Sequence, residues 1–188
     1  MKSGNEKGFT LIEVIVVAGI IAILAGILVP MIFKEIDESR ITRASADVKS
    51  ISSAMIVFRK DTAAWPSMDA ACGPNVTFLS GAGNLPSNLA AQGYDLGAAG
   101  SYDGQLSSDT NGCWTACSAN NNQKPCWGGP YMAMVTADPW GNTYITNANS
   151  FATDGQPVWI ISAGPNKLLD TAANSNTLQG DDIGLRIK

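Results

Sequence analysis

The chain of 188 residues contains no histidine, and its few charged side chains leave a net charge of −4. Without histidine it cannot form a Ser-His or Cys-His catalytic pair or a histidine-ligated metal site. The negative charge argues against a nucleic-acid partner, because proteins that bind nucleic acids present a basic patch. No nucleophile motif, phosphate-binding loop or pair of catalytic acids is recognisable either. We therefore expect neither an enzyme nor a nucleic-acid-binding protein.

One uncharged stretch is also apolar along its whole length, the twenty residues 14–33. As a helix with a rise of ~1.5 Å per residue, this stretch is ~30 Å long, which matches the hydrocarbon core of a bilayer. Lys2 and Lys7 precede it, and one carboxylate, that of Glu13, lies at its beginning. The pattern predicts a membrane helix that carries an acidic residue where lipid tolerates it least.

The segment KGFTLIEVIVVAGIIAILAGILVP, which contains this stretch, resembles the N-terminal segment of the type IV pilin family. In that family a prepilin peptidase cuts after the glycine and N-methylates the next residue. The resemblance implies a leader of residues 1–8, cleavage after Gly8 and methylation of Phe9. It also implies that Glu13 pairs with the N-terminal amine of an adjacent subunit during assembly. The alternative is a plain membrane anchor that never polymerises.

The position of the leader predicts the orientation of the chain. In a secretory signal the cleavage site follows the apolar segment, which is then lost. Here the expected cut precedes the apolar segment, so the mature chain keeps its helix. Lys2 and Lys7 favour a cytoplasmic leader by the positive-inside rule. We therefore expect a single-pass inner-membrane protein whose head lies in the periplasm.

After the membrane segment, the apolar residues follow the pattern of one helical face. They recur at spacings of four, three, four and three: Ala44, Val48, Ile51, Met55 and Phe58. No proline or glycine interrupts residues 31–60, so we expect one helix of ~76 Å over residues 9–59. Its transmembrane and assembly part is residues 9–33, and its amphipathic part is residues 34–60. The stripe suits packing beneath a globular head, and a partner-binding face is the other interpretation.

The remainder, residues 61–188, has the composition of a small head with long loops. Three short β-branched runs predict strands of an antiparallel sheet, namely residues 143–146, 158–162 and 183–187. Residues 67–126 are punctuated by glycine and predict mostly loop, with a short helix near residues 85–91. The expected fold class is α+β, a long N-terminal helix packed on a small antiparallel β-sheet head with long loops.

Four cysteines lie in the loop-rich region: Cys72, Cys113, Cys117 and Cys126. A four-thiolate zinc site requires tight CxxC pairs, and these spacings do not provide them. An oxidising periplasm favours two disulfides instead. Three pairings are open. The short spacing of Cys113 and Cys117 favours a bond between them, and a bond between Cys72 and Cys126 would then close the loop-rich region.

Two motifs follow, WGGPY at residues 127–131 and DPWGNTY at residues 138–144. They resemble the major pseudopilins of type II secretion systems, although residues 67–126 are longer and richer in cysteine than in that family. The resemblance implies self-association into a helical filament, together with minor pseudopilins and an inner-membrane assembly platform. A type IV pilus pilin is one alternative. Another is a membrane-anchored binding module that uses residues 67–126 to hold a ligand.

Acidic residues gather in the last connection of the chain, at Asp170, Asp181 and Asp182. Calcium takes six to eight oxygen ligands, which these carboxylates and a carbonyl such as that of Leu168 can supply in part. The alternative is solvated loop acids. The major pseudopilins bind calcium in this loop with an acidic pair that Asp181 and Asp182 match. The resemblance then implies that Asn166 or Asp170 replaces the aspartate of the family's upstream turn.

Overall fold

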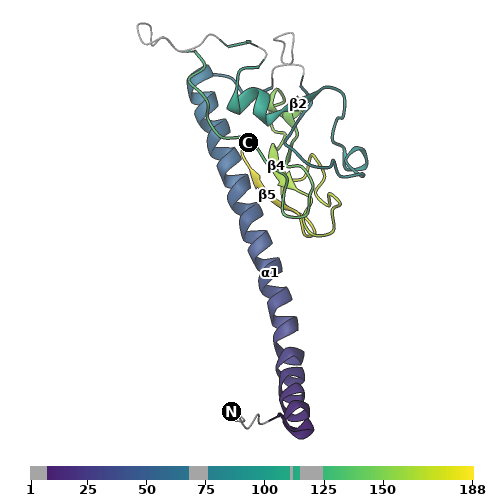
Figure 1. Ribbon diagram of the computed structural model, residues 1–188. Coiled ribbons are helices and arrows are strands. Elements are labelled where there is room, and N and C mark those ends of the chain that lie inside the picture. The colour runs from purple at the N-terminus through teal and green to yellow at the C-terminus, as the bar shows by residue number, and fades with distance from the viewer. Residues whose placement is uncertain (1–7, 68–75, 111, 115–124) are drawn as a thin grey trace, which may run out of the picture. The chain divides into compact units, whose positions relative to one another are not determined.

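The computed structural model of the chain describes residues 8–67, 76–110, 112–114 and 125–188 (Figure 1). The chain divides into two compact units, one that ends at Arg40 and one that runs from Ile41 to Lys188. The helix α1 (Leu11–Thr62) begins in the first unit and ends in the second. The other elements are β1 (Phe78–Ser80), η1 (Ala90–Gln92), β2 (Ala99–Ser101), η2 (Asp103–Ser107), β3 (Ile145–Thr146), η3 (Ala148–Phe151), β4 (Trp159–Ser162) and β5 (Ile183–Arg186).

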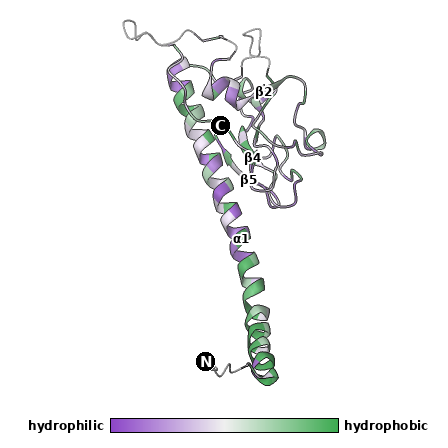
Figure 2. Cartoon of the chain, viewed as in Figure 1, coloured by the Kyte–Doolittle hydropathy of each residue, from purple (hydrophilic) through white to green (hydrophobic). Residues whose placement is uncertain are grey.

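In the first unit, α1 is apolar along most of its length (Figure 2). Its large side chains are exposed, for example Ile15 at 60% and Ile27 at 69%, and are therefore available to lipid or to other helices. Pro30 lies inside the helix without ending it. This confirms that the apolar and amphipathic segments form one helix. By length and composition, α1 is able to cross a membrane.

In the second unit, the stripe on α1 is confirmed as the side of the helix that faces the core. All its members are buried, namely Ala44, Val48, Ile51, Met55 and Phe58. The last four share one hydrophobic core with Leu79 of β1, Tyr144 and Ile160 of β4. The helix therefore packs on one face of the sheet, as its 3.6-residue periodicity predicts.

The end of α1 is held by aromatic contacts. The helix ends at Thr62, and the next residue, Ala63, has a positive φ of 59°. Glycine commonly occupies this position, because it adopts positive φ without steric cost. Arg59 lies 4.3 Å from the centroid of the Trp65 ring, and Trp65 stacks on Phe151 at 4.6 Å. These contacts favour the tight turn that leads from the helix into the head.

Within the described part of the chain, the sheet contains five strands in the order β2-β1-β3-β4-β5. The three predicted strands are confirmed as β3, β4 and β5, each with shorter bounds. The pairs β1–β3, β3–β4 and β4–β5 are antiparallel, whereas β1 and β2 are parallel. The three predicted strands therefore pair antiparallel as expected, and the additional parallel pair β1–β2 makes the sheet mixed. The extra strands β1 and β2 have only three residues each, too few for an alternating pattern to be visible in the sequence.

The helix predicted near residues 85–91 is also wrong. Residues 87–89 form a turn that leads into the single 3₁₀ turn η1. Gly93 ends this turn with a φ of 79°. The side chain of Asn88 is hydrogen-bonded to the backbone of Leu169, so this segment is shaped by a distant part of the chain.

A second, smaller hydrophobic core contains Trp159 and Ile161 of β4, whereas Ile160 belongs to the core beneath α1. Successive residues of a strand point to opposite faces, so β4 is buried on both sides. Tyr94 and Leu169 also belong to the smaller core. It therefore supports the connection between β4 and β5, where the acidic residues lie.

Candidate functional site

Thr10 and Glu13 form a reciprocal capping arrangement at the beginning of α1. The backbone N–H and the hydroxyl of Thr10 donate to Glu13 Oε2 at 2.8 and 2.7 Å. The Glu13 N–H donates to Thr10 Oγ1 at 3.4 Å. The resemblance-based prediction concerns a partner of Glu13 in another subunit, and the structure adds this role within the chain. The sequence carried the signal, since a threonine three residues before a glutamate is the capping-box pattern.

The predicted cleavage position lies just before this cap. Gly8 and Phe9 precede α1 as exposed, non-helical chain, and Phe9 is 89% exposed. A Cβ built on Gly8 would meet no atom within 4 Å. A peptidase therefore has room to reach this peptide bond, and cleavage there stays a prediction.

The residues predicted to bind calcium lie together in the connection between β4 and β5. The Asn166 backbone N–H donates to Asp181 Oδ2 at 2.9 Å, and its side-chain amide donates to Asp170 Oδ2 at 3.0 Å. The Leu168 N–H donates to Asn166 Oδ1 at 2.6 Å. The Asp170 N–H donates to Asp182 Oδ2 at 2.9 Å. The five residues are therefore linked into one hydrogen-bonded loop.

Two carboxylate oxygens in this loop are buried and have no hydrogen-bond partner among the described residues, Asp181 Oδ1 and Asp182 Oδ1. Asp182 is only 8% exposed. Its other oxygen also accepts the Thr171 N–H at 2.6 Å. Burial raises the pKa of Asp182, opposed by the hydrogen bonds from Thr171 and Asp170 and reinforced by the charge of Asp170. A buried, unpartnered carboxylate oxygen is costly unless a cation or a proton donor reaches it.

Two glycines allow the loop to close tightly. Gly164 and Gly180 both have positive φ, 64° and 61°. A Cβ on Gly180 would overlap the Asp170 carboxylate, and one on Gly164 would overlap the Asp181 carbonyl. Only glycine therefore fits at either position.

The loop offers the type of donor atoms that calcium prefers. These atoms are carboxylate and carbonyl oxygens, to which hard cations bind. Among the described residues, no group of three or more His, Cys, Asp or Glu side chains already stands in a metal-binding arrangement. Asp170 Oδ2 and Asp181 Oδ2 instead accept hydrogen bonds from Asn166. The two unpartnered oxygens of Asp181 and Asp182 are what a cation would find available.

Two of the four cysteines fall within the described residues, and both Cys113 and Cys126 are disulfide-bonded. Cys72 and Cys117 lie outside the described residues, so the pairing stays a prediction. Cys126 is buried, and its N–H donates to the Asp61 carbonyl at 3.1 Å. This bond ties the region after the cysteine-rich insertion to the end of α1.

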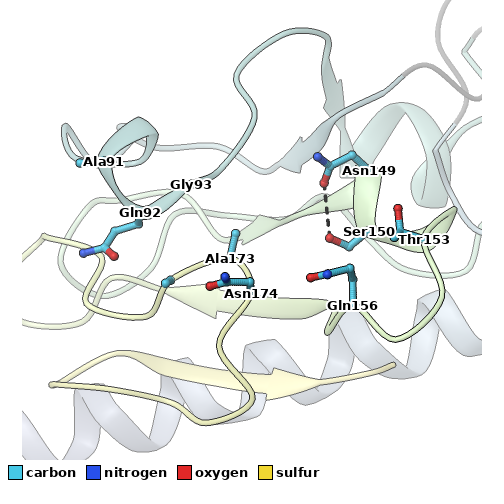
Figure 3. Close-up of a pocket in the computed structure, with 10 residues that line it drawn as sticks. Ala91, Gln92, Gly93, Asn149, Ser150, Thr153, Gln156, Ala173 and Asn174 are labelled. Atoms are coloured by element: carbon cyan, nitrogen blue, oxygen red, sulfur yellow. Dashed lines mark hydrogen bonds between the residues drawn. The ribbon is translucent and has the colours of Figure 1, made fainter.

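A hollow of about 560 Å³ lies beside η1 and η3 (Figure 3). Amides and hydroxyls dominate its lining: Gln92, Asn149, Ser150, Thr153, Gln156 and Asn174. The described residues around it include no charged or aromatic side chain. Such neutral walls do not suit a metal ion, and nothing in the hollow points to a particular ligand.

Comparison with known proteins starts at the N-terminus, where residues 3–29 match the family model described as "Prokaryotic N-terminal methylation motif". The match includes Glu13 and the predicted cleavage position after Gly8. The "Type II secretion system core protein G" of Pseudomonas aeruginosa is 39% identical to the chain over 67 residues. In its N-terminal segment the chain is therefore similar to type IV pilin-like proteins.

Two further relatives carry the same name. The protein from Klebsiella michiganensis is 29% identical over 69 residues, and that from Escherichia coli K12 is 24% identical over 168 residues. The first two matches cover 36% and 37% of this chain and 47% and 49% of the relatives, about half of their length. The E. coli match covers 89% of this chain and 87% of the relative. No solved structure matches the chain.

Proposed function

We propose that this chain is the structural subunit of a periplasmic pseudopilus that drives type II protein secretion. The observation that carries the proposal is the extent of the similarity to the E. coli core protein G, which covers 89% of this chain. A match confined to the N-terminal segment is common to pilin-like proteins in general. A match that continues through the head favours one branch of them.

The proposed organisation follows the order of the chain. Residues 1–8 are a leader removed by prepilin peptidase, and residues 9–33 are the transmembrane and assembly helix. Residues 34–60 continue that helix beneath the head, which is formed by residues 61–188. The chain crosses the inner membrane once and places its head in the periplasm, since the positive charges precede the helix.

Assembly is the role that the first unit supports best. The large apolar side chains of α1 are exposed there, including Val17 at 55% and Leu24 at 53%. Lipid covers such a surface in the membrane, and copies of the same helix cover it in a filament. We propose self-association into a helical filament, with minor pseudopilins, an inner-membrane assembly platform and prepilin peptidase as partners. The role is structural rather than enzymatic.

We also propose that calcium binds in the loop between β4 and β5. The carboxylates of Asp170, Asp181 and Asp182 and the carbonyl of Leu168 would hold the ion, and Asn166 lies beside them. The unpartnered oxygens of Asp181 and Asp182 support this assignment. Calcium would supply the positive charge that offsets three neighbouring carboxylates and would order the loop on the head.

One experiment distinguishes this proposal from its two alternatives, a type IV pilus pilin and a membrane-anchored binding module. Cells that overproduce the chain are examined by electron microscopy with an antibody against the head. A pseudopilus subunit yields filaments that depend on the secretion machinery. A type IV pilin yields surface pili that depend on a pilus machinery instead. A membrane-anchored binding module yields labelled envelope without filaments, which contradicts the proposal.

A further inference from the structure

A third unpartnered oxygen lies outside the acidic loop, on the side chain of Tyr94. This tyrosine is 3% exposed, and within the described residues its hydroxyl has no hydrogen-bond partner. It follows η1 and the turn at Gly93. Its ring belongs to the smaller core together with Ala163 and Leu169. Ala163 precedes the acidic loop between β4 and β5, and Leu169 lies within it, so Tyr94 shares a core with residues of that loop.

The charge of one loop carboxylate, that of Asp182, acts on Tyr94. Burial raises the pKa of Tyr94 well above its ordinary range, and the negative charge of Asp182 raises it further. The phenol is therefore a neutral hydrogen-bond donor. Asp182 Oδ1 is a buried acceptor without a partner. Buried donors and acceptors in proteins are normally hydrogen-bonded. The buried Tyr94 hydroxyl and the buried Asp182 Oδ1, which both lack a partner among the described residues, therefore point to an interaction with each other.

We propose that Tyr94 is a positioning residue for the acidic loop between β4 and β5. The Tyr94 hydroxyl donates to the Asp182 carboxylate, directly or through one water, and orients this carboxylate toward calcium. The inference rests on the calcium site proposed above. Partners that orient a ligating carboxylate from outside the coordination sphere commonly change metal affinity by ~10–100-fold when they are removed.

A second contact from the same segment holds the other side of the loop. Asn88 Nδ2 donates to the Leu169 carbonyl at 2.8 Å, and the Leu169 N–H donates to Asn88 Oδ1 at 2.9 Å. Both polar atoms of the Asn88 side chain are therefore used by one backbone residue of the loop. This contact exists without a metal, whereas among the described residues the Tyr94 hydroxyl has no partner. Residues 88–94 thus brace the loop at Leu169 and orient its acid at Asp182.

The two contacts predict different phenotypes. Asn88→Ala removes a bond present in the metal-free chain and lowers its melting temperature with or without calcium. Tyr94→Phe removes only a hydroxyl and keeps the ring in the small core. It leaves the metal-free melting temperature unchanged or slightly raised, because a buried unpartnered group is lost.

The test is a calcium titration of the full chain in detergent by calorimetry, after treatment with chelator. Tyr94→Phe is expected to weaken calcium binding by ~10–100-fold. Tyr102→Phe is the matched control, since its buried hydroxyl is bonded to Thr146 Oγ1 at 2.7 Å and not to a residue of the loop. That variant loses stability while its calcium affinity stays that of the wild type.

The outcomes separate this inference from the calcium site itself. If Asp182→Asn abolishes binding while Tyr94→Phe binds calcium as tightly as the wild type, Tyr94 has no positioning role and the site stands. If the wild type itself binds no calcium, both ideas are overturned. Weaker binding in Tyr94→Phe, with an unchanged metal-free melting temperature and an unaffected Tyr102→Phe control, supports the inference.

Discussion

The Glu13 carboxylate accepts both the backbone N–H and the hydroxyl of Thr10, at 2.8 and 2.7 Å, and so caps the helix from which it projects. In the single chain, this carboxylate is satisfied locally. A capping role requires only an acceptor at this position, which glutamine also supplies. A charge pair with the amine of another subunit requires the negative charge. The two roles therefore separate by substitution.

Glu13→Gln is expected to keep the helix cap and to abolish filaments. Loss of one partner of a buried charge pair costs about 2–5 kcal/mol per contact, and a filament repeats that loss at every subunit. Glu13→Val, which lacks both charge and cap, is expected to be cleaved and inserted but not assembled. Filament yield by electron microscopy is the measurement.

Thr10→Ala is the matched control, because it weakens the cap by about 1 kcal/mol and keeps the charge. We expect it to assemble. Normal filaments from Glu13→Gln, combined with their loss in Thr10→Ala, would show that capping rather than the charge pair explains Glu13.

Processing should produce a mature chain that begins at Phe9. The bond after Gly8 lies in exposed, non-helical chain next to the cap of α1. Intact-mass spectrometry of the purified protein should find residues 9–188 with one added methyl group on the N-terminal amine. Gly8→Trp should leave the leader attached. A mature chain that starts at Met1, or one cut after the apolar segment, contradicts this prediction.

Calcium should raise the melting temperature of the head. Without the ion, Asp170, Asp181 and Asp182 repel one another across one loop. At a calcium concentration of about 100 times Kd, binding contributes about 2.7 kcal/mol. For a chain of this size that corresponds to a rise of roughly 5–11 °C. Differential scanning fluorimetry with calcium and with chelator measures it.

Asp181→Ala should remove the response to calcium in the same experiment, and Asp154→Ala, at a carboxylate outside the loop, should keep it. A melting temperature that calcium does not change in the wild type removes the site from this account.

The cysteines should form two intramolecular disulfides, Cys72–Cys126 and Cys113–Cys117. Cys113 and Cys126 are both disulfide-bonded in the structure. Peptide mapping without reduction identifies the partners, since each pairing gives a different linked peptide. Reduction should lower the melting temperature, because the bonds constrain loops with little apolar core of their own. Free thiols at all four positions in periplasmic protein contradict the prediction.

The elements that the sequence predicts well are those in which periodicity extends over many residues. The stripe that includes Val48 and Phe58 covers four helical turns, and all of it is buried. The strand around Ile160 is a β-branched run bounded by turn residues, and it is buried on both faces of the sheet. By contrast, β1 and β2 have three residues each and show no period.

The candidate loop was predictable only in part. The acids are visible in the sequence, and the resemblance gathers them into one loop. The residues outside the loop that hold it in place are not visible in the sequence, because Asn88 contacts Leu169, 81 residues later. Tyr94 likewise comes from another segment, and its pKa is raised by burial and by the charge of Asp182. A lone asparagine or tyrosine in a glycine-rich stretch has many structural roles, and only the folded chain distinguishes between them.

The most direct test of the central claim is protein secretion by cells that lack this chain. A strain with the gene deleted is compared with the same strain carrying the wild type or Glu13→Gln, and exported proteins are quantified in the medium and the periplasm. The account predicts that the deletion traps folded exported proteins in the periplasm, that the wild type restores their release, and that Glu13→Gln does not. Normal secretion in the deletion strain, together with loss of surface pili, would contradict the account and favour a type IV pilin.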